Sequence, residues 1–251
     1  MNRKLFAFGI NIDAITMEEA IVKCIELAKQ RKEYLSFVVT PNINHLVKLE
    51  SNSDFYEAYK SASLVVVDGR PVKSILALAN KSIPEVIPGS DLVPNILNRA
   101  SDKIELKVYL LGAGPGVAEK AIININKLWP KVLVVGYLSP PIGFENDPML
   151  CNDIITHIND SNPDLIIVGL GAPKQEIWIN KHKQHIRAGL AICAGATIDF
   201  IAGDKKRAPI YLQKLSLEWL YRIYTEPKRL FKRYLFDSMC LPYIIYKELF
   251  K

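Results

Sequence analysis

Short polar side chains stand directly after β-rich runs of the sequence, and one of them is a carboxylate. Asp68 follows Val65-Val66-Val67, where the chain would leave a buried strand. A partly buried carboxylate at such a point can act as a general base, and a cap for the helix that begins near Pro71 is the structural alternative. Thr40 and Asn42 follow another run and offer a hydroxyl and an amide. Their structural alternative is also a helix cap.

Two glycine-rich turns have the composition of a diphosphate site. Gly112-Ala113-Gly114-Pro115-Gly116 follows one apolar run, and Gly169-Leu170-Gly171 follows another. Backbone N–H groups and the dipole at a helix start favour phosphate oxygens, while a tight turn without a ligand is the alternative. The third glycine of the first turn comes one residue too early for the dinucleotide fingerprint G-x-G-x-x-G. This spacing disfavours an NAD-dependent oxidoreductase.

Three sequence features argue against a metal or a resident cofactor. The chain contains no Asp-x-Asp, the usual carboxylate pair that holds a divalent metal on a nucleotide sugar. His182 and His185 lie among lysines, which favours a solvated helix face over a metal site. The cysteines show no C-x-x-C spacing, so we expect reduced thiols. A diphosphate leaving group would then be stabilised by backbone dipoles and basic side chains.

The elements that must position these residues alternate along the first 200 residues. Several apolar runs are apolar throughout, as in strands buried on both faces, and amphipathic stretches separate them. We therefore expect an α/β fold, with a Rossmann-like, mostly parallel sheet flanked by helices. The polar residues above would meet at the carboxyl ends of the strands, where such folds bind ligands. Strands are predicted at 5–8, 34–39, 64–67, 108–111, 132–137, 165–168 and 190–193, and helices at 17–30, 115–129, 148–158 and 174–185.

The last 49 residues differ from the rest in charge. The chain has a net charge of +6, and residues 203–251 hold 11 Lys and Arg against 5 Asp and Glu, so they carry the whole excess. Aromatic residues are frequent there, and helices are predicted at 208–224, 226–237 and 241–250, separated by prolines. We expect an α/β domain over residues 1–202 and a basic helical appendage over 203–251. Trp and Tyr mixed with Leu favour an anionic membrane surface over nucleic acid, and a basic helical cap is the structural alternative.

Composition narrows the class of protein. With 49% hydrophobic and 23% charged residues, the chain is not disordered as a whole. The longest stretch without a charged residue, Tyr34–Val47, is too short and too polar in its middle to span a membrane. The first residues lack the apolar core of a signal peptide. We therefore expect a cytoplasmic location.

An ordered set of motifs extends over nearly the whole chain. It comprises Val39-Thr40-Pro41-Asn42, Val67-Asp68-Gly69, Pro88-Gly89-Ser90-Asp91-Leu92, the two glycine turns, Gly195-Ala196-Thr197-Ile198-Asp199-Phe200, Ala208-Pro209 and Leu217-Glu218-Trp219-Leu220-Tyr221-Arg222. In these motifs and their order, the chain resembles the WecG/TagA/CpsF glycosyltransferase family (glycosyltransferase family 26).

The resemblance implies a GT-E type fold and an inverting, metal-independent sugar transfer. The best-known members move N-acetylmannosamine, or its uronic acid, from a UDP-sugar to polyprenyl-pyrophosphate-linked N-acetylglucosamine. They do so at the inner face of the cytoplasmic membrane, in teichoic acid or common-antigen synthesis. The UDP-sugar is a substrate, so no cofactor is implied. The expected location is peripheral at that membrane face, and a homo-oligomer is left open.

Roles for individual residues follow from the resemblance. It implies Asp68 as the base on the acceptor hydroxyl, with Thr40 and Asn42 lining the acceptor pocket. It implies the two glycine turns, together with Gln175 and Asp199, as the UDP-sugar site; a helix cap is the structural alternative for Asp199. It also implies that the appendage covers the active site and contacts the pyrophosphate through Arg222, Arg229 and Arg233.

One segment departs from the teichoic-acid and common-antigen members. Residues 138–147 replace a short Gly- and Phe-bearing turn with Leu138-Ser139-Pro140-Pro141 and the residues after it. That segment is closer to the exopolysaccharide branch, so a UDP-glucose or UDP-uronic acid donor is the alternative within the family. A nucleic-acid-binding module that uses the basic appendage is the alternative from another class. A docked scaffold without catalysis is disfavoured, because Asp68, Thr40 and Asn42 are all present.

Overall fold

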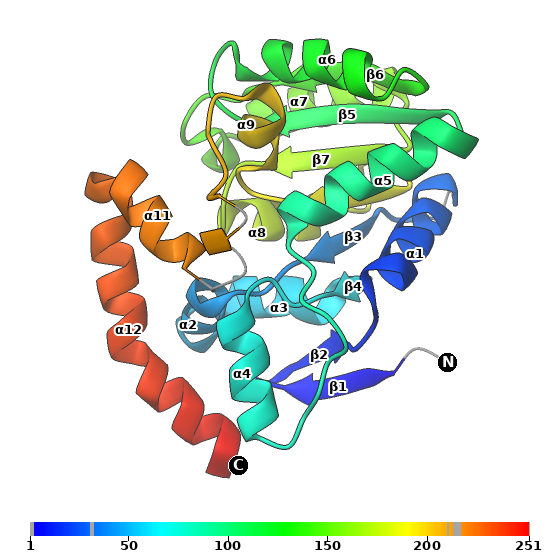
Figure 1. Ribbon diagram of the computed structural model, residues 1–251. Coiled ribbons are helices and arrows are strands. Elements are labelled where there is room, and N and C mark those ends of the chain that lie inside the picture. The colour runs from blue at the N-terminus through cyan, green and yellow to red at the C-terminus, as the bar shows by residue number, and fades with distance from the viewer. Residues whose placement is uncertain (1–2, 31–32, 210, 213–216, 251) are drawn as a thin grey trace.

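A six-stranded parallel sheet forms the centre of the computed structural model, which describes residues 3–30, 33–209, 211–212 and 217–250 (Figure 1). The strand order is β4-β3-β8-β7-β5-β6, and every neighbouring pair is parallel. The predicted α/β class is confirmed. The strands are β3 (Ser36–Val39), β4 (Leu64–Val65), β5 (Leu106–Gly112), β6 (Val132–Leu138), β7 (Leu165–Gly169) and β8 (Leu190–Cys193).

An antiparallel hairpin precedes the sheet. The predicted strand at 5–8 is β1 (Lys4–Ala7), and it pairs with β2 (Ile10–Asp13), a strand additional to the predicted ones. Phe8 and Gly9 join them, and both have a positive φ. Two-residue hairpin loops favour this geometry because its twist matches that of the strands.

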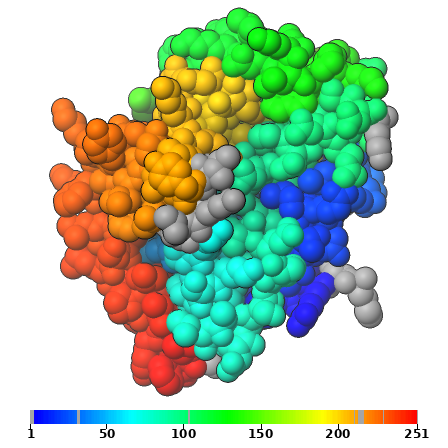
Figure 2. Space-filling model, in the orientation of Figure 1, coloured from blue at the N-terminus to red at the C-terminus, as the bar shows by residue number. Residues whose placement is uncertain are grey.

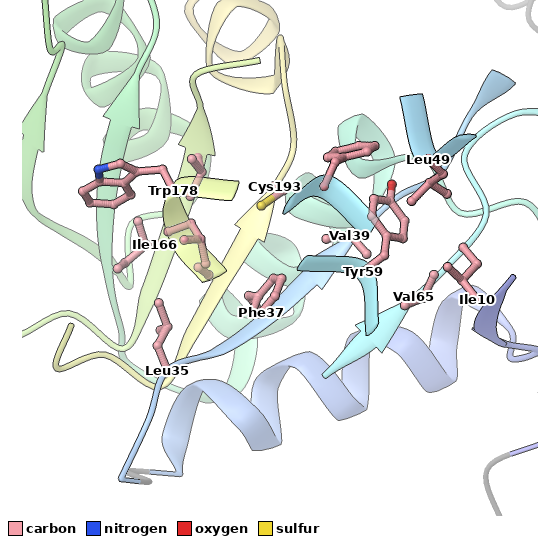
Figure 3. Packing of buried hydrophobic residues seen from close by; sticks show 14 of the residues in the cluster. Ile10, Leu35, Phe37, Val39, Leu49, Tyr59, Val65, Ile166, Trp178 and Cys193 are labelled. Atoms are coloured by element: carbon pink, nitrogen blue, oxygen red, sulfur yellow. The ribbon is translucent and has the colours of Figure 1, made fainter. Parts of the chain in front are cut away.

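Helices cover both faces of the sheet. Phe37 and Val39 of β3 face one buried cluster, and Val38 between them faces the other. Figure 3 shows part of the first cluster, with the labelled side chains of Phe37, Val39 and Tyr59 among its members. Burial on both faces explains why these strands are apolar throughout. The first face is covered by α2 (Ile43–Ser51), α3 (Ser53–Ser61), α7 (Pro148–Ser161) and α8 (Lys174–His182), and the second by α1 (Met17–Lys29), α5 (Gly89–Lys103), α6 (Val117–Leu128) and α9 (Thr197–Ala202).

The described helices of the appendage pack against the first half of the chain. They are α11 (Glu218–Thr225) and α12 (Pro227–Phe250), and α12 lies along α2 and α4 (Arg70–Leu78), as Figure 1 shows. Leu230 and Ile244 of α12 are buried. The Lys247 ammonium lies 2.5 Å from a Glu50 carboxylate oxygen of α2, so both apolar and ionic contacts hold the helix.

The predicted helix boundaries in the appendage are partly wrong. Residues 206–209 are not helical, and α11 begins at Glu218; residues 210 and 213–216 lie outside the described part. Pro242 was expected to separate two helices, but it lies inside α12. A proline costs about 3 kcal/mol in a helix interior, and burial of Leu230 and Ile244 on either side of it offsets this cost. The division into two domains at residue 203 stays a prediction.

No helix in the described ranges combines the length and the apolar character that crossing a membrane requires.

Candidate functional site

A cavity of about 910 Å³ lies beyond the carboxyl ends of β3 and β4. Asn42 and Asp68 line it from the loops after these strands, and Ser90 and Asp91 line it from the start of α5. The appendage supplies the opposite wall, with Arg207 before α11 and further side chains of α11 and α12. In Figure 2, the orange and red surface of these two helices borders the cyan surface around α4. The cavity is therefore enclosed by segments far apart in the sequence.

Asp68 is placed in the cavity by hydrogen bonds to the loop after β3. Its backbone N–H donates to the Pro41 carbonyl at 2.9 Å, and its Oδ2 accepts from the Asn42 amide at 3.5 Å. The helix-cap alternative for Asp68 is wrong, because the N-cap of α4 is Gly69, without a side-chain cap bond. The carboxylate is therefore not engaged in capping and can face a ligand.

Burial and nearby charges set the acidity of Asp68. Burial is the main cause that raises the pKa of Asp68 to about 6. The Arg222 guanidinium and the Asn42 amide lower this pKa, whereas the carboxylates of Glu218 and Asp91 raise it further. A carboxylate with this pKa is ionised at neutral pH and is a stronger proton acceptor than an exposed aspartate. The chemistry available at this position is removal of a proton from a bound hydroxyl.

Asn42 and Thr40 occupy different positions relative to the cavity. Asn42 caps α2, since its Oδ1 accepts the His45 N–H at 3.2 Å, and it also lines the cavity through its amide. The capping and site interpretations of Asn42 are thus compatible. Thr40 is 5% exposed and is not among the cavity-lining residues. It lies behind the wall, near the start of α5, where its hydroxyl is 3.6 Å from the position of a Cβ on Gly89.

Two of the three predicted appendage arginines line the cavity. Arg222 donates to Glu218 at 3.0 Å and lies over the Phe200 ring, 5.5 Å from its centre. Arg233 lines it from α12. Arg229 also belongs to α12, but its side chain lies outside the described part of the structure.

Sequence reasoning missed a further arginine. Arg207 lines the cavity, pairs with Asp91 and covers the same Phe200 ring at 5.9 Å. Its position directly before the Ala208-Pro209 motif was the available signal. The cavity therefore has cationic groups suited to an anionic ligand, held in place by carboxylates and aromatic rings.

The two glycine turns lie together, but away from the cavity. Gly112 pairs with Gly169 across β5 and β7, and the Ala113 N–H donates to the Gly169 carbonyl at 3.2 Å. A Cβ on Gly112 would lie 2.6 Å from the Gly169 carbonyl carbon, so this close approach alone requires glycine. The described cavity includes no residue of either turn. Gly114, Gly116 and Gly171 belong to the same two turns, and the role of these glycines in UDP-sugar binding stays a prediction.

Gln175 and Asp199 also lie outside the cavity lining. Gln175 is buried, and its Oε1 accepts the Gly171 N–H at 3.2 Å, so it holds the second turn. Asp199 forms an ion pair with Lys205 at 3.6 Å, and the N-cap of α9 is Ala196 rather than Asp199. The cap alternative for Asp199 is therefore wrong, and its contact with a UDP-sugar stays a prediction.

In the part of the chain that the structure describes, no group of three His, Cys, Asp or Glu side chains is arranged to hold a metal ion. The cysteines there are free thiols.

Comparison with known proteins agrees with the sequence motifs. The model of the glycosyl transferase WecG/TagA/CpsF family matches residues 5–251. A relative from Bacillus spizizenii is 29% identical over 194 residues, which are 77% of this chain and 73% of the relative. One from Staphylococcus aureus strain NCTC 8325 is 29% identical over 230 residues, 90% of this chain and 87% of the relative. Both are named N-acetylglucosaminyldiphosphoundecaprenol N-acetyl-beta-D-mannosaminyltransferase.

Proposed function

Because the chain belongs to the WecG/TagA/CpsF family and is a glycosyltransferase, we propose that it transfers N-acetylmannosamine from UDP-N-acetylmannosamine to polyprenyl-diphosphate-linked N-acetylglucosamine. The relatives named above support this donor and this acceptor; the UDP-glucose or UDP-uronic acid alternative rests on residues 138–147 alone, and no relative named above supports it or the nucleic-acid-binding module. The reaction would belong to the synthesis of teichoic acid or a related cell-surface polymer. The observation that carries the proposal is Asp68, a candidate base on a cavity that also presents arginines.

The proposed mechanism is a single inverting displacement that needs no metal. Asp68 takes the proton of the acceptor hydroxyl while the oxygen of that hydroxyl forms a bond to the anomeric carbon of the donor sugar. The bond from that carbon to UDP breaks, and UDP leaves with the electron pair. Attack from the face opposite UDP inverts the anomeric carbon, and the charge development resembles that of inverting glycoside hydrolysis. Arg207, Arg222 and Arg233 are placed to stabilise diphosphate charge.

The test is acceptor-dependent release of UDP. Wild-type protein would be given UDP-N-acetylmannosamine, UDP-N-acetylglucosamine, UDP-glucose and a UDP-uronic acid in turn, with a short-chain lipid-diphosphoryl-N-acetylglucosamine and EDTA. We expect release with UDP-N-acetylmannosamine, and a loss of about a hundredfold or more in Asp68→Asn. Asp153→Asn, on the exposed surface of α7, is the matched control.

Each outcome of this test has a defined meaning. Release from UDP-glucose or the uronic acid alone would overturn the proposed donor. A requirement for added metal would overturn the metal-independent mechanism. If Asp68→Asn turned over as fast as the wild type, Asp68 would not be the base. No acceptor-dependent release from any donor would overturn the proposed acceptor.

The surface of the appendage supports docking on an anionic membrane as part of this function. Large apolar side chains of α11 and α12 are exposed, among them Tyr224, Phe231, Phe236, Tyr243 and Phe250. Exposed lysines of α12 stand near them in the sequence. Interfacial helices combine these two features, because the apolar side chains enter the headgroup region while the lysines meet anionic lipids. A lipid-linked acceptor would then be presented at the mouth of the cavity.

Vesicle flotation tests the docking. We expect the protein to float with vesicles that contain anionic lipid, to bind neutral vesicles less, and to be released partly by salt. Lys228→Glu combined with Lys232→Glu should weaken binding. Equal binding of this variant, or none by the wild type, would contradict the proposal.

A further inference from the structure

The start of α2 presents two asparagines to the cavity, and each donates to a carboxylate. Asn42 donates to Asp68, and Asn44 donates to Asp237 of α12 at 2.9 Å. The hydrogen bonds of the two amide oxygens fix how the amides are oriented. The Asn42 Oδ1 accepts the His45 N–H, and the Asn44 Oδ1 accepts a hydrogen bond from the Lys48 ammonium. The cavity thus has a second carboxylate, held in the same manner as the candidate base but supplied by the appendage.

One side-chain oxygen of Asp237 has no hydrogen-bond partner among the residues that the structure describes. The residue is 3% exposed and lines the cavity, and its Oδ1 accepts the Asn44 amide. Its Oδ2 is buried and has no hydrogen-bond partner among the described residues. Buried polar atoms are nearly always paired, because an unpaired one has lost its hydrogen bonds to water without replacement. An unpaired carboxylate oxygen on a cavity wall is therefore a candidate for a bond to a ligand.

A donor lies one helical turn away from this acceptor. Arg233 precedes Asp237 by four residues on α12, so both side chains project from the same face of the helix, and both line the cavity. The Arg233 Nε is also buried and, within the described part of the chain, has no hydrogen-bond partner. The pair thus offers an acceptor beside a cationic donor. A sugar joined directly to a diphosphate carries the complementary groups, a hydroxyl or amide N–H beside phosphate oxygens.

Attachment of α12 to α2 accounts for the Oδ1 of Asp237 but not for its Oδ2. The helix is held independently by buried Leu230 and Ile244, and by the ion pair of Lys247 with Glu50 of α2. An apolar side chain at position 237 would fill the same space without an unpaired oxygen.

We propose that Asp237 is a sugar-binding residue that sets specificity, with its Oδ2 accepting a hydrogen bond from a hydroxyl or acetamido N–H of the hexosamine held beside Asp68. The inference rests on the proposed function and adds the appendage to the sugar site. A sugar of the donor and a sugar of the acceptor present the same chemistry, and the experiment separates them. Sites that hydrogen-bond a substrate group reject analogues that lack it, because the buried partner is then left unpaired.

The experiment measures coupling between Asp237 and single groups of the sugars. Wild type, Asp237→Asn and Asp237→Ala would be assayed with acceptors that lack one hydroxyl or the acetamido group, and with matching UDP-sugar analogues. We expect one analogue to have a kcat/KM at least tenfold below that of the complete substrate with wild-type protein. For Asp237→Ala, the kcat/KM of the same analogue should be less than threefold below that of the complete substrate. If that analogue is an acceptor, the group belongs to the acceptor sugar; if it is a UDP-sugar, it belongs to the donor sugar.

Lys247→Ala is the control for a merely structural role. It removes another contact between α12 and α2, at a site remote from the cavity lining, so we expect wild-type discrimination among the analogues. Thermal unfolding checks that each variant is folded. If Asp237→Ala is not folded, Asp237→Asn takes its place in the comparison. The inference is overturned if every analogue costs Asp237 variants as much as wild type, or if Lys247→Ala loses the same discrimination. No turnover by the wild type with any donor would instead overturn the proposed function, and this inference with it.

Discussion

Two carboxylates near the carboxyl edge of the sheet differ in what surrounds them. Asp68 borders the cavity, and its pKa of about 6 results from burial opposed by Arg222 and Asn42. Glu176 is fully buried, and burial raises its pKa to about 7, opposed by the Gln175 amide that donates to it and by Lys48. The first group is accessible to a substrate, whereas the second affects the stability of the fold.

The pH dependence of turnover should follow Asp68. Its carboxylate must be ionised to accept a proton, so kcat/KM should rise with pH through about 6 and level off above it. At pH 5, we expect roughly a tenth of the rate at pH 8. Because Arg222 lowers the pKa of Asp68, Arg222→Gln should move the midpoint of the profile to higher pH. A profile without an inflection between pH 5 and 7 would argue against Asp68 as the base.

The stability of the protein should depend on Glu176. Its folded pKa of about 7 lies above the ordinary value of 4.5, so the native state holds its proton over a range where the unfolded state has lost it. The free energy of unfolding therefore falls as pH rises from about 4.5 to 7, by on the order of 3 kcal/mol.

Glu176→Gln tests this assignment, because it keeps the shape of the side chain and removes the titration. We expect the variant to gain stability over wild type at pH 8 relative to pH 5, as measured by urea unfolding at both values. Parallel pH profiles for the two proteins would show that Glu176 is not the group responsible.

The order of the strands decides which turns share a site. The cavity lies over β3 and β4, while the glycine turns follow β5 and β7, and β8 lies between the two groups. All of these turns lie at the same edge, as the parallel topology requires, yet only the turns at one end of the sheet line the cavity. A cluster of glycines along the sequence is therefore not by itself a ligand site, since Gly112 is explained by its contact with Gly169.

Substitution of two glycines separates packing from ligand binding. Gly112→Ala would place a Cβ 2.6 Å from the Gly169 carbonyl carbon at a φ of +110°, so we expect a loss of about 3 kcal/mol or more in unfolding free energy. Gly116 has a φ of +77°, and no atom of the described residues lies within 4 Å of such a Cβ, so Gly116→Ala should cost only about 1–2 kcal/mol. Denaturant unfolding compares them. Loss of UDP-sugar turnover in a stable Gly116→Ala would support a ligand role for the first turn.

The appendage completes the cavity of the whole molecule. Arg207, Arg222, Arg233 and Asp237 all follow Gly203 in the sequence, and they form the wall opposite Asp68. The same segment exposes apolar side chains on its outer surface. One segment therefore lines the site and carries the proposed membrane surface, which would link binding of a lipid-borne acceptor to assembly of the site.

Truncation after Gly203 tests this arrangement. The six-stranded sheet lies entirely before that residue, so we expect the shortened chain to fold. Turnover with a short-chain acceptor should fall by about a thousandfold, because the groups placed to stabilise the leaving diphosphate are removed. Loss of the contacts of α12 with α2 and α4 exposes apolar surface, so light scattering should show more self-association. Full activity of the shortened chain would contradict the role of the appendage.

The features that depend only on residues close together in the sequence could be predicted from it. Apolar runs buried on both faces identified the strands of the sheet, and their parallel arrangement followed from the helices between them. The positions of Asp68 and Asn42 after adjacent strands placed both at the ligand edge. These predictions succeed because periodicity and strand ends are local properties of the chain.

The tertiary structure alone decided which of these residues meet. The separation of the glycine turns from Asp68 depends on strand order, and the place of Arg207 and Asp237 depends on where the appendage packs. The continuity of α12 through Pro242 likewise depends on its buried contacts with other parts of the chain. The hydrogen bonds of α12 to Asn44 and Glu50 join residues 193 and 197 positions apart. The energies of such contacts override local propensity, so no local pattern contains them.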